Sequence, residues 1–140
     1  MFEQFMKKNK IKKEIKKYAP TKSLLDEKGN PLEWEFKAIS TIENEKLRDE
    51  CTTEVPVKGK YGQTKLKLDT NLYIAKLITA CTVVPDLNNK ALQDSYGVYG
   101  SVNLLRELVD NPGEYTDLTM FIQELNGFTD INEEVKEAKK

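Results

Sequence analysis

The chain has 140 residues, of which 32% are charged and 39% hydrophobic, and its formal net charge is −1. This length and composition are typical of a single soluble globular domain with a sizeable core. The longest apolar stretch falls short of the ~20 residues of a membrane span, and no apolar block follows the N-terminal lysines as it would in a secretory signal.

The chain contains no histidine, which removes the commonest general base and the commonest metal ligand. Cys51 and Cys81 lack the close spacing of a metal-binding pair, and we expect both thiols to be reduced and buried. A catalytic pair of carboxylates, of the kind that glycosidases use, is left as an alternative, but the sequence shows no apolar pocket around any pair. We therefore expect no metal and no cofactor, and an enzyme that works with carboxylate or lysine side chains stays as an alternative.

The first twenty residues form a basic arm with seven lysines and two glutamates. A helical pattern over residues 2–18 divides its apolar side chains between two opposite faces: Phe2, Phe5 and Met6 on one, and Ile11, Ile15 and Tyr18 on the other. One interpretation is two short segments. Another is an arm that packs on the domain at one end and binds a partner at the other. A solvated end without a binding role is the alternative.

Strands are expected in the N-terminal half. A short strand at 22–25 and a turn at 26–31 precede residues 32–38, which alternate so that Leu32, Trp34, Phe36 and Ala38 point inward. A capping box at Ser40 and Glu43 predicts a helix to about residue 51. Further strands follow at 52–57 and 64–68. Trp34 is expected to be a core anchor.

Residues 71–84 are apolar almost throughout and predict a central helix covered on most sides. Asp69 or Thr70 is the expected N-cap, and Pro85 is expected to end the helix.

Four helices are expected after Pro85. The first covers about 90–96, with Asn88 or Asn89 as its N-cap, and the second begins at a Ser101 cap and runs to about 109. The third covers 114–126 and ends in a Schellman motif at Gly127. The fourth covers about 132–139. Shape-setting roles are expected for Pro85, Asp86, Tyr96, Gly97 and Gly127.

These elements predict an α+β fold that is mostly helical. A small antiparallel sheet in the N-terminal half packs beside a helical C-terminal half around the buried central helix. The expected organisation is an arm at residues 1–20 and one domain at 21–140, with sheet-forming residues at about 21–69 and helical residues at about 70–140.

Four stretches, in order, resemble one known family: residues 5–17 (FMKKNKIKKEIKK), 26–39 (DEKGNPLEWEFKAI), 42–52 (IENEKLRDECT) and 84–97 (VPDLNNKALQDSYG). The last is followed by ELNGF at residues 124–128. In combination they resemble the XkdN-like phage tail assembly chaperones of Gram-positive phages and prophages. The resemblance covers nearly the whole chain, and the family has no catalytic signature.

The resemblance implies a non-enzymatic assembly factor of the host cytoplasm that is absent from the mature virion. Its implied client is the tape-measure protein, a long helical chain with exposed apolar stripes. Tail-tube subunits and a second copy of the chain are further candidate partners.

Two candidate binding surfaces follow. One is the arm, through Phe2, Phe5, Met6, Ile11 and Ile15. The other is an apolar groove in the helical half, lined by Leu118, Phe121, Ile122, Leu125 and Phe128, which would accept a client helix. The alternative for the second set is ordinary packing on the central helix.

A competing function is nucleic-acid binding by the lysine-rich arm. Residues 107–135 carry eight acidic residues and no Lys or Arg. That acidic segment would repel a phosphate backbone, which makes nucleic-acid binding the weaker hypothesis.

Overall fold

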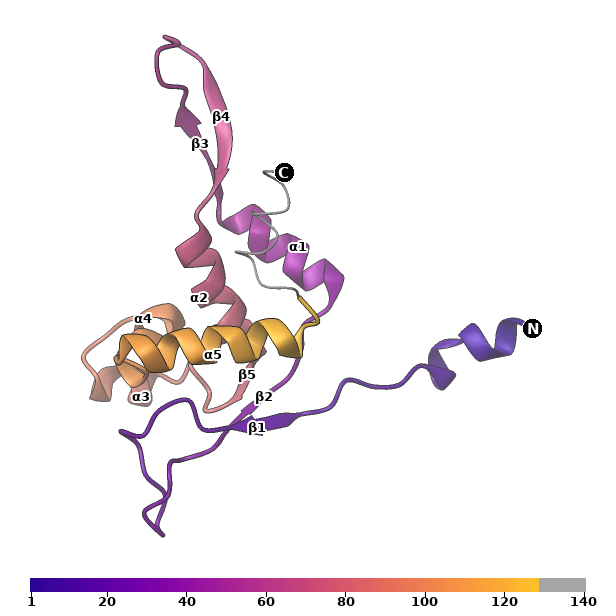
Figure 1. Ribbon diagram of the computed structural model, residues 1–140, viewed down its shortest axis with the longest axis vertical. Helices are drawn as coiled ribbons and strands as arrows, with labels where there is room; N and C mark the ends of the chain where they lie inside the picture. Colours follow the sequence, from indigo (N-terminus) through magenta and orange to yellow (C-terminus); the bar gives the residue numbers. More distant parts are fainter. Residues whose placement is uncertain (129–140) are drawn as a thin grey trace.

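The structure is a computed structural model that describes residues 1–128. It confirms the α+β class, with short antiparallel strands mainly in the N-terminal half and helices in the C-terminal half. Figure 1 shows a helical body from which two segments extend, the N-terminal arm and a long hairpin. The helix expected at 132–139 lies outside the described residues.

A three-stranded antiparallel sheet forms one side of the body, in the order β1 (Lys16–Tyr18), β2 (Trp34–Phe36) and β5 (Thr82–Val84). Tyr18 lies opposite Trp34, and Glu35 lies opposite Val84. Trp34 and Phe36 are buried whereas Glu35 between them is partly exposed, as the alternation predicted. The inward face is shorter than expected, because Leu32 is exposed.

The strand expected at 22–25 is wrong. The partner of β2 on that side is β1, and residues 22–25 contribute only an isolated bridge between Leu25 and Pro31. The turn predicted at 26–31 is present. The Asp26 carboxylate accepts hydrogen bonds from the amides of Lys28 and Asn30, both at 2.9 Å. The three-residue β1 therefore joins the root of the arm to the sheet.

The helical pattern over residues 2–18 does not produce an α-helix. The arm contains two short 3-10 turns, η1 (Phe2–Phe5) and η2 (Lys7–Asn9), and continues in extended form into β1. Many of its lysines would be spaced three or four apart in a helix, where like charges repel. No described element covers an apolar face of this arm to offset that repulsion, since residues 1–17 are all exposed.

The central helix α2 (Thr70–Cys81) is N-capped by Asp69, whose carboxylate accepts a 3.1 Å hydrogen bond from the Leu72 amide. It packs against helices on several sides, as predicted. It ends three residues earlier than expected, because residues 82–84 form β5 instead. These residues are all β-branched and suit a strand, so Pro85 follows a strand and does not end the helix.

Helix α1 (Thr41–Glu50) begins at the predicted capping box. The Glu43 amide donates to the Ser40 hydroxyl, and the Ser40 amide donates to the Glu43 carboxylate, both at 3.2 Å. After α1, strands β3 (Thr52–Pro56) and β4 (Thr64–Leu68) form the long hairpin, close to their predicted bounds.

Three helices complete the described chain: α3 (Lys90–Ser95), α4 (Ser101–Leu108) and α5 (Pro112–Leu125). Asn89 caps α3 as expected. Two predicted starts are corrected. Gly100 and not Ser101 occupies the N-cap of α4, and α5 begins two residues early, because proline is well tolerated in the first turn of a helix.

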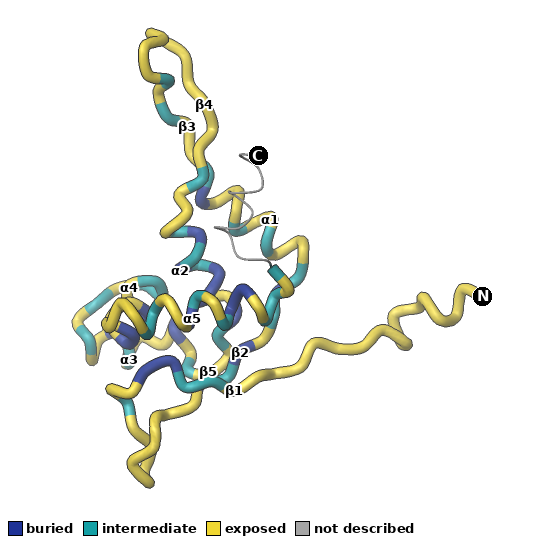
Figure 2. The backbone as a smooth tube through the Cα atoms, viewed as in Figure 1, coloured by how far each residue is buried: buried dark blue, intermediate teal, exposed yellow. Residues whose placement is uncertain are grey.

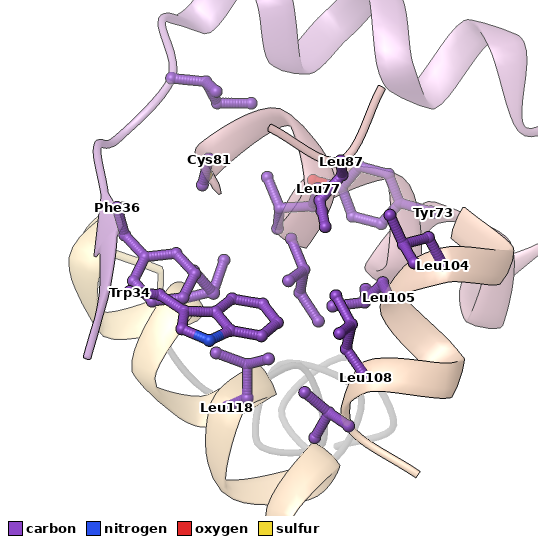
Figure 3. Packing of buried hydrophobic residues seen from close by; sticks show 14 of the residues in the cluster. Trp34, Phe36, Tyr73, Leu77, Cys81, Leu87, Leu104, Leu105, Leu108 and Leu118 are labelled. Carbon is purple, nitrogen blue, oxygen red and sulfur yellow. The ribbon is translucent and has the colours of Figure 1, made fainter. Parts of the chain in front are cut away.

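The core lies between the three-stranded sheet and helices α2, α4 and α5 (Figure 2). Figure 3 shows the Trp34 ring lying among aliphatic side chains of these helices, with Leu118 close beside it. Trp34 is 1% exposed, which confirms its predicted role as a core anchor.

Candidate partner-binding surfaces

The N-terminal arm leaves the body at β1 and is exposed along its length (Figures 1 and 2). Its apolar side chains remain largely open to solvent: Phe2 and Phe5 are each 83% exposed, Ile11 is 89%, and Met6 and Ile15 are about half exposed. Among the described contacts, the Lys13 ammonium donates to the Ile39 carbonyl near the root of the arm. Solvent-exposed aromatic side chains on an extended basic segment are a candidate binding surface.

The root of the arm is fixed by aromatic packing. Tyr18 stacks on Phe121 of α5, with ring centroids 4.4 Å apart, and Phe121 meets Phe36 edge-on at 5.4 Å. Burial, followed by the nearby Asp117 and Glu114 carboxylates, raises the pKa of Tyr18. The arm is therefore attached firmly at one end and projects from there.

The second set of candidate residues lies in and around the core. Leu118 and Ile122 are fully buried, and Phe121, Leu125 and Phe128 are partly buried against the same cluster. In this structure these side chains pack on the sheet and on α2, as the alternative interpretation stated. Within residues 1–128, Leu118 and Ile122 are too deeply buried to line a groove that is open to a client helix.

The candidate shape-setting residues occupy turns and junctions. The Val84–Pro85 peptide bond is cis, and the Asp86 carboxylate accepts a 3.0 Å hydrogen bond from the Asn88 amide. Tyr96 is partly buried beside the core, and Gly97 has a φ of 67° at the end of α3.

The end of α5 has the predicted Schellman geometry. The Phe128 amide donates to the Gln123 carbonyl at 2.9 Å, and the Gly127 amide donates to the Glu124 carbonyl at 3.0 Å. Gly127 has a φ of 75°, in the left-handed region that favours glycine.

The β3–β4 hairpin is a third surface, which sequence reasoning identified as strands but not as a binding element. It extends from the body with a fully exposed Tyr61 at its tip and an exposed Leu66 on β4. The available signal was a tyrosine between two glycines in a lysine-rich turn, Gly59 to Gly62. That signal shows a turn and does not show that the turn projects from the body.

An open hollow lies where α2, α4 and α5 meet, with a volume of about 590 Å³. Ile74, Val109, Pro112 and Tyr115 supply apolar walls, and Arg106 and Asp110 supply opposite charges. Burial raises the pKa of Tyr115, while the nearby Arg106 guanidinium acts in the opposite direction.

Comparison with known proteins decides the family. The sequence model described as "Phage XkdN-like tail assembly chaperone protein, TAC" matches residues 2–139. The chain belongs to this family.

Individual relatives agree with that assignment. The chain is 32% identical over 136 residues to the phage-like element PBSX protein XkdN of Bacillus subtilis, covering 97% of this chain and 90% of that protein. It is 33% identical over 120 residues to the uncharacterized protein YqbN of the same organism, covering 86% and 79% respectively. The crystal structure of YqbN superposes with a TM-score of 0.76 at 27% identity, covering 91% of this chain and 96% of that one.

This tail assembly chaperone is a non-enzymatic protein, as its family indicates. Its two cysteines are free and buried, and burial is the main cause that raises the pKa of each thiol. The Asn126 amide also donates to Cys81 Sγ at 3.3 Å. Residues 1–128 contain no cluster of metal-ligating side chains and no helix long and apolar enough to cross a membrane.

Proposed function

We propose that this tail assembly chaperone binds the tape-measure protein through the apolar side chains of its N-terminal arm. The observation that carries the proposal is the exposure of Phe2, Phe5 and Ile11 on a segment whose root is fixed to the body. Binding takes place in the host cytoplasm before the tail is complete, and the chaperone is absent from the finished particle.

The physical requirement is to cover apolar stripes on a long helical client until tail-tube subunits assemble around it. An extended arm can follow a helix surface and place several aromatic and aliphatic side chains on its stripe. The interspersed lysines keep the free arm in solution, because like charges oppose self-association. Tail-tube subunits are a second candidate client for the same arm.

The test is co-expression with the tape-measure protein of the same phage, scoring its solubility and its co-purification with the chaperone. One variant replaces five arm side chains with serine: Phe2, Phe5, Met6, Ile11 and Ile15. The matched control replaces Lys7, Lys8, Lys10 and Lys12 with glutamine and keeps every apolar side chain.

We expect the wild-type chain and the glutamine control to keep the client soluble and bound, and the serine variant to lose both effects. None of the substituted side chains is buried, so circular dichroism should show all three proteins folded alike. A serine variant as effective as the wild type would overturn the proposal.

Nucleic-acid binding by the arm makes the opposite prediction. A DNA mobility shift that disappears in the glutamine variant and weakens steeply with salt would support it, because each neutralised phosphate releases counterions. The exposed acidic side chains of α4 and α5 argue against it.

A further inference from the structure

We propose that the tip of the β3–β4 hairpin binds, in a second copy of this chain, the hollow between α2, α4 and α5. This contact uses neither the arm nor the tape-measure protein, so it stands independently of the function proposed above. It assigns a role to two features that the arm hypothesis leaves unused.

The β3–β4 hairpin is unusual because its two strands project from the body and pair with no other described strand. Within residues 1–128, β3 and β4 pair only with each other, and most of their side chains are exposed (Figures 1 and 2). An isolated two-stranded hairpin is marginally stable in water. Positive φ angles at Gly59 (81°) and Gly62 (78°) shape a tip that leaves Tyr61 fully exposed. Tyrosine is enriched among the residues that anchor protein interfaces, and here it stands exposed at the end of a projecting element.

The hollow supplies a matching receptor. Its apolar walls accept an aromatic ring, and its volume of about 590 Å³ is ample for a tyrosine side chain. Arg106 lines it and can lie against the ring of a bound tyrosine, which is a favourable cation–π arrangement.

The charges of the hairpin and of the helical half favour a second copy of the chain as the occupant of the hollow. The hairpin carries four lysines and one glutamate between residues 52 and 68, with Lys58 and Lys60 beside the tip. The hollow itself is lined by one acid and one base, Asp110 and Arg106, but the helices around it are acidic, because residues 107–128 carry five acidic residues and no Lys or Arg. A tip tyrosine placed in the hollow brings Lys60 toward Asp110.

The tip and the hollow of one chain cannot meet. The foot of the hairpin runs directly into α2, and Asn71 and Ile74 of α2 line the hollow. Each five-residue strand spans about 17 Å, so the tip lies far from the foot and from the hollow beside it. A hairpin tip that binds this hollow must therefore come from another copy of the chain.

Edge-to-edge pairing of two hairpins is a less favourable way to join copies. Antiparallel pairing of β4 with β4 centred on Leu66 would place Lys65 opposite Lys67, and like charges directly opposite destabilise a sheet. This leaves the tip as the favoured contact.

Sedimentation velocity of the full chain over a range of concentrations, at low and high salt, tests the proposal. We expect reversible self-association that Tyr61→Ala weakens about tenfold or more, as truncation of an aromatic anchor does. Tyr99→Ala is the matched control, because Tyr99 is also a loop tyrosine and is 90% exposed. The five-serine arm variant should associate as the wild type does.

Charge reversal then tests the pairing itself. Lys60→Glu and Asp110→Lys should each weaken association, and the double variant should recover it. A chain that is monomeric at all concentrations, equal effects of the two tyrosine substitutions, or no recovery in the double variant would overturn the proposal. If the wild-type chain is monomeric and binds DNA, and Tyr61→Ala loses that binding, the hairpin tip contacts nucleic acid and the proposal is overturned.

Discussion

The ring of Tyr18 lies parallel to the ring of Phe121, with 8° between the planes and 4.4 Å between the centroids. One ring belongs to β1 at the root of the arm, and the other to α5 in the helical half. The stack therefore joins the first strand of the sheet to the last described helix, and it sets the point from which the arm projects.

Removing this stack should destabilise the body and not merely the arm. We expect Tyr18→Ala to lower the free energy of unfolding by about 2 kcal/mol, because a partly buried ring and its stacking are both lost. Tyr18→Phe keeps the stack and should be nearly neutral. Urea unfolding measures both, with Tyr99→Ala as the exposed control. Equal stability of Tyr18→Ala and Tyr99→Ala would contradict the role of the stack.

A second long-range contact depends on Glu114. Its carboxylate accepts hydrogen bonds from the Thr21 hydroxyl at 2.9 Å and from the Lys22 amide at 2.8 Å, and Thr21 is 1% exposed. We expect Glu114→Ala to cost about 1–3 kcal/mol of unfolding free energy, because the Thr21 hydroxyl is left with fewer partners in a buried place.

Glu114→Gln keeps an acceptor oxygen and should cost less. Glu124→Ala, an exposed position on the same helix, is the control. Thermal unfolding ranks the three, and the prediction fails if Glu114→Ala unfolds at the same temperature as Glu124→Ala.

Alkaline pH should destabilise the protein through Cys81. Burial raises the pKa of this thiol above its ordinary value of 9.0, whereas the unfolded chain exposes it. The folded state then holds the proton more tightly than the unfolded chain does. The contribution of the protonated thiol to the free energy of unfolding is therefore fully present below about pH 9 and is lost as the pH rises.

Urea unfolding at pH 8 and pH 10 measures this loss. Buried Tyr73 and partly buried Tyr115 also have raised pKa values and act in the same direction. Cys81→Ala should therefore reduce the pH dependence without removing it. An unchanged pH dependence in Cys81→Ala would show that this thiol contributes nothing.

The end of α5 should be sensitive to backbone conformation alone. A Cβ added at Gly127 would meet no atom of the described residues within 4 Å, yet φ is 75° there. We expect Gly127→Ala to cost about 1–2 kcal/mol from left-handed strain, and Gly127→Asn to cost less, because asparagine tolerates this conformation better. Thermal unfolding compares the two variants, and equal melting temperatures for both and the wild type would contradict the expectation.

Local chemistry determined several helix boundaries from the amino-acid sequence by itself. The Ser40–Glu43 capping box, the Asn89 cap and the Gly127 ending are each made by side chains or backbone within a few residues, so a local pattern specifies them. The family was recognisable for a related reason: its characteristic stretches cover nearly the whole chain in order. The α+β class followed from the same alternation and helical spacing.

Tertiary structure decided how these pieces meet. Residues 82–84 could extend the central helix by composition, but pairing with β2 draws them into a strand. Likewise, the apolar residues of α5 are the same whether they line a groove or fill a core. Leu118 and Ile122 are buried because they pack in one core with Trp34, Phe36 and α2. No described residue covers the apolar side chains of the arm or Tyr61 at the tip of the hairpin in this way. Burial depends on partners distant in the chain, and a periodic pattern says which face is apolar without saying what covers it.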